Sequence, residues 1–202
     1  MAGRSDGSHR RQTLPFTCGA AALGSALAAL GWRGSRNRLD DELAIWREST
    51  AIACPGAHPF GLALSARRRG FSVQVVGTGR RPWLGNHVRT VHSFSNRRLY
   101  ARIERGLEQE CRKVGISIRW PDHPTEQNGV GLLLVPEGGE TPGEHVPHWI
   151  AVRGTAGGVY VDDPLRASGY RSNLSILDWW GRSGFETTRT WIAIQLSKKR
   201  GR

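Results

Sequence analysis

Apolar positions follow helical spacing over much of the first 114 residues, and they alternate or run together in most of the chain after that. Helices are predicted at 18–30, 40–48, 59–69, 96–114 and, as a short one, 175–182. Strands are predicted at 71–77, 116–120, 131–136, 148–154, 158–163 and 190–196. Because helices come first and strands later, the pattern indicates the α+β class. Residues 78–96 carry mixed turn and strand signals and stay unassigned.

A single domain is expected over residues 12–196, because no linker divides the chain and no internal repeat is present. Residues 1–11 are expected to form a mobile basic tail, and residues 197–202 an exposed one. No apolar run reaches the roughly 18 residues that a membrane span needs. The start of the chain superficially resembles a signal peptide, but its apolar run begins late and fits a buried helix equally well, so that interpretation is rejected.

The formal net charge is +12, from 29 Lys and Arg against 17 Asp and Glu. This charge favours an anionic partner, such as an acidic protein, a nucleic acid or a charged substrate. Nucleic acid is the weakest of these, because the chain has no recognised reading motif and no interleaved basic and aromatic residues. Three cysteines at unpatterned spacing, Cys18, Cys54 and Cys111, exclude a disulfide framework and indicate a reducing cytoplasm.

Cys18 is the candidate nucleophile, because it begins the predicted helix 18–30. The unpaired N–H groups and partial positive charge of a helix N-terminus stabilise a thiolate. Thr17 is expected to cap this helix. From position alone, a small core residue is an equally good interpretation of Cys18. Cys54 and Cys111 are expected to be inert.

His148 and Asp163 are the candidate base and its orienting carboxylate. A four-residue loop at 154–157 would pair residues whose numbers sum to 311, which places His148 opposite Asp163. The carboxylate would then accept the imidazole N–H and stabilise the imidazolium. Taken singly, a histidine or an aspartate at these positions more often has a structural role. Only their placement opposite each other on the hairpin favours a catalytic role. An error of one residue in loop length would exchange Asp163 for Asp162, so this choice stays open.

Gln12 lies six residues before Cys18, and its side-chain amide would complete an oxyanion hole with the backbone N–H of Cys18. On its own, a glutamine in a polar tail is weak evidence. His58 and Trp149 are candidate substrate-binding residues, although a residue that begins a helix and a core tryptophan are the plainer interpretations. The spacing of histidines and cysteines indicates no metal site, and no cofactor is predicted.

Several of these features together resemble the peptidase C39-like branch of the papain-like cysteine peptidases: Gln12-x5-Cys18-Gly19, a small-residue helix, His148 before an apolar strand, and Asp163-Pro164. Residues 42–71 are similar to a bacterial C39-like group first catalogued as a domain of unknown function. The resemblance covers about residues 10–196. Ala20 stands where the family commonly has proline, and alanine is acceptable in a first helical turn.

The resemblance implies a papain-like fold, with N-terminal helices packed on a C-terminal antiparallel sheet. It also implies a nucleophile at Cys18, a base at His148, an orienting carboxylate at Asp163 and an oxyanion donor at Gln12. The expected reaction is acyl transfer through a thioester at Cys18.

Water as the acceptor would make the protein a cytoplasmic hydrolase of peptide or amide bonds, which is the leading expectation. An amine as the acceptor would make it an aminoacyl or peptidyl transferase that takes a carrier-bound acyl group. A basic surface would suit an acidic carrier or another acidic partner protein. A non-catalytic binding module with the same fold is a further alternative, and no membrane partner is expected. The substrate side chain and the oligomeric state stay open.

Overall fold

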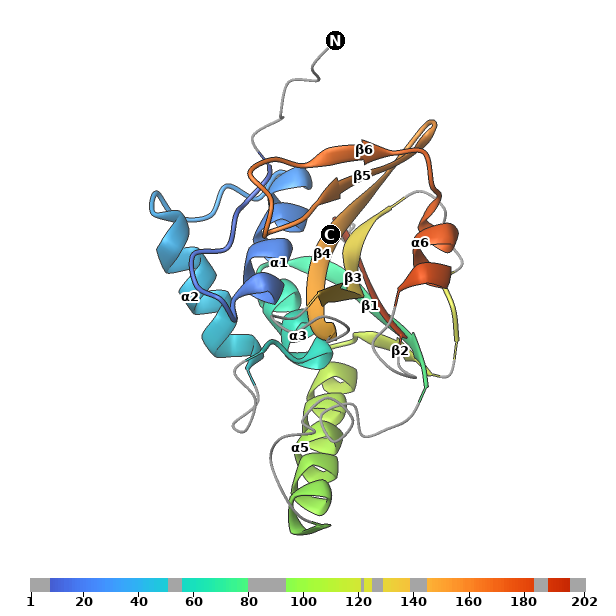
Figure 1. The fold of residues 1–202 in the computed structure, drawn as a ribbon. Helices are drawn as coiled ribbons and strands as arrows, with labels where there is room; N and C mark the ends of the chain where they lie inside the picture. Colours follow the sequence, from blue (N-terminus) through green and yellow to red (C-terminus); the bar gives the residue numbers. More distant parts are fainter. Residues whose placement is uncertain are drawn as a thin grey trace, which may run out of the picture.

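The computed structural model describes residues 8–50, 56–79, 94–120, 122–124, 129–138, 145–183 and 189–196. The helices in these ranges are α1 (Cys18–Ala29), α2 (Arg38–Ser49), α3 (Pro59–Arg68), α5 (Phe94–Lys113) and α6 (Ile176–Arg182). The strands are β1 (Phe71–Thr78), β2 (Ser117–Arg119), β3 (Val130–Gly138), β4 (His145–Thr155), β5 (Gly158–Asp162), β6 (Tyr170–Ser172) and β7 (Arg189–Leu196). The α+β class is confirmed (Figure 1).

The strands form one sheet in the order β2-β1-β7-β3-β4-β5-β6. Neighbouring strands are antiparallel except β1 and β2, which are parallel. The expected packing of N-terminal helices on a mainly antiparallel sheet is confirmed, and the parallel pair of β1 and β2 at one edge adds to it. The helix α5 lies between β1 and β2 in the chain, and a crossover of this kind allows parallel pairing. No helix in the described ranges is long and apolar enough to cross a membrane.

Apolar side chains line both faces of the sheet. Leu132 and Leu134 of β3 join the cluster that includes α1, α2 and α3. Leu133 and Val135 of the same strand join the cluster that includes Ile176 and Trp180 of α6. Successive residues of a strand point to opposite faces, so β3 contributes to both clusters. Figure 1 shows α1, α2 and α3 on one side of the sheet and α6 on the other.

The N-terminus of α1 packs closely on the sheet at Gly19. A Cβ atom at this position would lie 2.6 Å from the Cβ of Ala57 and 3.0 Å from Cδ1 of Trp149. Trp149 is 2% exposed, and its indole N–H donates to the Ala57 carbonyl at 3.2 Å. The glycine thus allows the first turn of α1 to lie against both residues.

We expect Gly19→Ala to lower the free energy of unfolding by about 1–3 kcal/mol, because the added methyl group has no space. Urea denaturation measures the change. Gly106→Ala is the matched control, since Gly106 is exposed on α5 and a Cβ there meets nothing within 4 Å. This control is expected to be neutral or stabilising. Equal stability of Gly19→Ala and the wild-type protein would contradict the packing described.

Residues 8–14, here called the N-terminal strap, belong to the folded structure. Ser8 is 3% exposed, the backbone N–H of Arg10 donates to the Ser25 hydroxyl at 2.8 Å, and the Arg10 guanidinium bonds to Asp41 at 3.1 Å. The expectation of a mobile tail is therefore wrong for residues 8–11, because buried polar partners hold these residues in place. Residues 1–7 and 197–202 lie outside the described ranges. Residues 80–93, which form most of the segment 78–96 that the sequence left unassigned, lie outside them as well.

Candidate active site

The chain before α1 is fixed by Glu42 of α2. Its carboxylate, 6% exposed, accepts hydrogen bonds from the backbone N–H and the hydroxyl of Thr13, each at 2.8 Å, and from the Thr17 hydroxyl. Thr17 occupies the N-cap position, but its side chain makes no capping hydrogen bond. The expected role of its hydroxyl is therefore wrong, because its oxygen accepts from the backbone N–H of Leu14 at 3.2 Å and its hydrogen is directed to Glu42. The first turn of α1, with Cys18, is held by this anchored loop.

Strands β4 and β5 are joined by a two-residue turn at 156–157. Paired residues sum to 313, as in Ala151 with Asp162 and Thr155 with Gly158. The expected four-residue loop and its 311 register are therefore wrong. The error is two residues, and side chains alternate with a period of two, so it does not exchange Asp162 and Asp163. Asp163 directly follows the last residue of β5.

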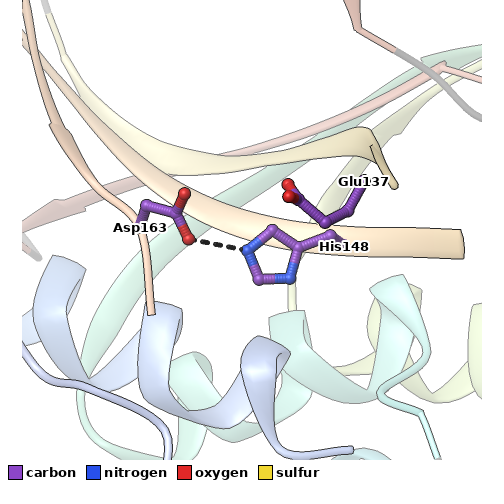
Figure 2. Close-up of side chains that lie close together, drawn as sticks. All are labelled: Glu137, His148 and Asp163. Carbon is purple, nitrogen blue, oxygen red and sulfur yellow. Dashed lines mark hydrogen bonds and ion pairs between the residues drawn. The ribbon is translucent and has the colours of Figure 1, made fainter. Parts of the chain in front are cut away.

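The His148 ring and the Asp163 carboxylate are in contact (Figure 2). The Nε2–H of His148 donates to Oδ1 of Asp163 at 2.9 Å, and the two residues are 3% and 7% exposed. Asp163 also accepts from the backbone N–H of Leu165 at 3.0 Å and from Nε of Arg166 at 3.3 Å. Asp162 instead lies 3.1 Å from Nδ1 of His9. Of the two aspartates, the structure therefore brings Asp163 to the histidine.

The same imidazole interacts with Cys18. Burial disfavours the charged ring, but hydrogen bonds to Asp163 and Cys18 and their negative charges outweigh it, and the pKa of His148 rises to about 9. Burial opposes ionisation of Asp163 as well, yet hydrogen bonds from His148 and Leu165 hold the pKa of its carboxyl below the usual value. The two shifts therefore favour the charged form of His148 and the charged form of Asp163.

Gln12 lies in the N-terminal strap, next to the segment that carries Asp163. Its backbone N–H donates to the Pro164 carbonyl at 3.0 Å, and its side-chain N–H donates to the Leu14 carbonyl at 3.0 Å. The amide nitrogen carries two hydrogens, so one N–H remains for another acceptor. Oε1 of Gln12 is buried and has no hydrogen-bond partner among the described residues.

The two predicted substrate-binding residues are core residues. His58 is fully buried and is the N-cap of α3. Its Nδ1 accepts a hydrogen bond from the Phe60 N–H at 3.1 Å, and its Nε2 lies 3.7 Å from the Glu104 carboxylate. Trp149 is buried under Gly19. The structure thus contradicts their placement in a substrate cleft. The plainer interpretations, a residue that begins a helix and a core tryptophan, describe both side chains.

Glu137 of β3 is a neighbour of this site that the sequence did not reveal. One carboxylate oxygen of Glu137, one oxygen of Asp163 and one ring nitrogen of His148 lie within 4.8 Å of one another (Figure 2). One histidine and two carboxylates form a donor set that zinc accepts. A metal would have to displace the proton that His148 shares with Asp163, and the raised pKa of His148 makes that costly at neutral pH. Protonation of His148 therefore opposes metal binding at this cluster at neutral pH.

Cys111 is chemically quiet in comparison with Cys18. It is fully buried, and burial raises the pKa of its thiol to about 12. A thiol of this kind is protonated at neutral pH and inaccessible to reagents. Cys18 is partly exposed. Cys54 lies outside the described residues.

A family model described as "Peptidase_C39 like family" matches residues 8–177, which is most of the chain. No curated protein and no solved structure matches the chain. The matched range contains Cys18, His148 and Asp163, and the α+β architecture agrees with the papain-like fold of cysteine peptidases. The chain therefore belongs to the Peptidase_C39 like family.

Proposed function

We propose that the protein is a cysteine enzyme that transfers acyl groups through a thioester at Cys18, and that its main reaction is hydrolysis of a peptide or amide bond. The observation that carries the proposal is the His148 ring, which bonds to Asp163 at 2.9 Å and also interacts with Cys18. A base oriented by a carboxylate and in contact with a sulfur nucleophile is the arrangement that nucleophilic acyl transfer requires. Because Cys18 must stay a free thiol, we place the enzyme in the reducing cytoplasm.

In this mechanism the thiolate of Cys18 attacks the substrate carbonyl carbon and forms a C–S bond. The backbone N–H of Cys18 and the second side-chain N–H of Gln12 stabilise the oxyanion. The imidazolium of His148 gives its proton to the leaving amine as the C–N bond breaks. The neutral ring then takes a proton from water, which attacks the thioester and regenerates the thiolate. Asp163 keeps the ring oriented throughout.

Intact-protein mass spectrometry tests the proposal with small acyl and aminoacyl thioesters as probes. We expect the mass of one acyl group on the wild-type protein, located at Cys18 by peptide mapping, and none on Cys18→Ala. Cys111→Ala is the control and should be acylated like the wild-type protein, because Cys111 is fully buried. Equal acylation of Cys18→Ala and the wild-type protein would contradict the proposal.

A transferase is the second candidate, and the surface charge favours it. Four exposed arginines, here called the arginine patch, line two small pockets beside α1 and α2: Arg11, Arg33, Arg36 and Arg38. One pocket also contacts Ala20 and Ala21, in the helix that begins at Cys18. A cationic surface in this place suits an acidic carrier that delivers an acyl group to Cys18.

Arg36→Glu with Arg38→Glu separates the two candidates. For a transferase, we expect the KM for an acidic, carrier-bound acyl group to rise about tenfold or more, with little change for a small thioester. For a hydrolase without a carrier, the double substitution would change the KM values for the two substrates by similar factors. The ratio of amide product to free acid in the presence of an added amine identifies the acceptor directly.

A further inference from the structure

The N-terminal strap contacts the segment that carries Asp163, here called the aspartate loop (residues 162–166). Nδ1 of His9 lies 3.1 Å from the Asp162 carboxylate, and Nε2 of the same ring lies 3.1 Å from the Arg166 carbonyl. Three residues further along, the Gln12 N–H donates to the Pro164 carbonyl at 3.0 Å. Segments about 150 residues apart in the chain thus lie side by side (Figure 1).

The contact between His9 and Asp162 is shielded from water, because the two side chains are only 10% and 4% exposed. A carboxylate and a backbone carbonyl both accept hydrogen bonds and do not donate them. The ring of His9 therefore bridges the Asp162 side chain and the Arg166 backbone, with one ring nitrogen on each.

His9 connects the two ends of the aspartate loop. Asp162 precedes Asp163 directly, and Arg166 follows it by three residues. Within the loop, the Arg166 N–H donates to the Asp163 carbonyl at 3.0 Å, and the Leu165 N–H donates to Oδ1 of Asp163 at 3.0 Å. The same Oδ1 accepts from His148 at 2.9 Å. A rotation of the loop would therefore move the oxygen that orients His148.

We propose that His9 is a positioning residue, which holds the aspartate loop so that the carboxylate of Asp163 stays on the ring of His148. This role rests on the proposed function, in which Asp163 orients His148. His9 itself contacts Asp162 and the Arg166 backbone, so it acts on the reaction only through the loop.

The test compares His9→Phe with the wild-type protein by NMR titration of His148. Phenylalanine keeps a ring of similar size and removes both hydrogen bonds. We expect the pKa of His148 to fall from about 9 by about one pH unit, because its bond to Asp163 weakens. Alkylation of Cys18 by iodoacetamide at pH 7 should slow by about three- to tenfold. His123→Phe is the matched control, since that side chain is 73% exposed, and it should change neither quantity.

A double-mutant cycle with Asp163→Asn shows whether His9 acts through the loop. If it does, His9→Phe has no further effect on the pKa of His148 once Asp163 is replaced. Additive effects, or an unchanged pKa in folded His9→Phe, would overturn the proposal.

His9→Gln covers the case in which His9→Phe does not fold. Glutamine keeps a side-chain N–H donor for one of the two acceptors, so we expect a smaller fall in the pKa of His148 in the same direction. No fall in folded His9→Gln would count against the positioning role. Failure of the proposed function has a different signature, because Cys18 would then form no thioester while the effect of His9 on His148 stays measurable.

Discussion

Replacing His148 with alanine is expected to slow acyl transfer by about 10²- to 10⁴-fold, the usual contribution of a general acid and base. The ring is the only described side chain hydrogen-bonded to Asp163 that also interacts with Cys18, so its loss removes both the proton donor and the positive charge beside the sulfur. Alkylation of Cys18 by iodoacetamide at pH 7 should therefore slow as well, because the thiolate loses its imidazolium partner.

Peptide mapping after a timed reaction with iodoacetamide measures this effect at each cysteine. Cys111 is the internal reference, because it is fully buried and its thiol pKa is about 12. We expect it to react only after denaturation, in the wild-type protein and in the variant alike. His123→Ala is the matched control and should leave Cys18 as reactive as before, since His123 is exposed. An unchanged rate at Cys18 in His148→Ala would contradict the proposed pair.

The second large effect is expected for Asp163→Asn, which keeps the size of the side chain but removes its charge. We expect acyl transfer to fall by about 10²- to 10⁴-fold, because the asparagine amide no longer stabilises the imidazolium of His148. The pKa of His148 should fall toward its ordinary value of 6.5, since the hydrogen bond to Asp163 and the negative charge of Asp163 both raise it.

The same substitution changes how stability depends on pH. The pKa of His148 is raised from 6.5 to about 9 on folding, so its charged form contributes stability that is fully present below pH 6.5 and is lost as the pH rises through 9. The contribution is on the order of 3 kcal/mol. The pKa of Asp163 is lowered on folding, so its contribution is present above pH 3.8 and is lost as the pH falls further.

Urea denaturation of the wild-type protein and Asp163→Asn at pH 7 and pH 10 measures this dependence. We expect the wild-type protein to be more stable at pH 7 and the difference to shrink at pH 10, where His148 is neutral. A difference in unfolding free energy that is equal at both pH values would show that the Asp163 charge does not act on the His148 proton.

The main helices and strands could be predicted because their apolar periods are strong. The small-residue run that begins at Cys18 is a helix, and it starts at that residue. The strand β6 could not be predicted, because Tyr170–Ser172 lacks an apolar pattern and is held by pairing with β5. The parallel pairing of β1 and β2 could not be predicted either, because the relative direction of the two strands depends on the path of α5 between them.

The hairpin shows why a site can be predicted despite a wrong register. The glycines at 154, 157 and 158 allow several loop lengths, so the sequence could not separate a two-residue turn from a four-residue loop. The two alternatives differ by an even number of residues, and both direct Asp163 rather than Asp162 toward His148. The loop after β5 then brings Asp163 within 2.9 Å of the ring.

The residues that could not be predicted act through partners distant in the chain. Thr17 bonds to Glu42 across 25 residues, and His9 meets Asp162 across 153 residues. Glu137 reaches His148 only because β3 and β4 pair in a particular register. Local patterns carry no information about such contacts. His58 was wrongly placed in a substrate cleft, because a polar residue before a helix can also cap that helix from inside the core.

NMR titration of His148 in the wild-type protein and in Cys18→Ala tests the central claim most directly. Signals of the ring are assigned by their loss in His148→Gln. The account predicts a pKa of about 9 in the wild-type protein and a fall of about one pH unit or more in Cys18→Ala, because the sulfur no longer stabilises the charged ring. A pKa near 6.5 in the wild-type protein, or the same pKa in both proteins, would contradict a thiolate–imidazolium pair at Cys18 and His148.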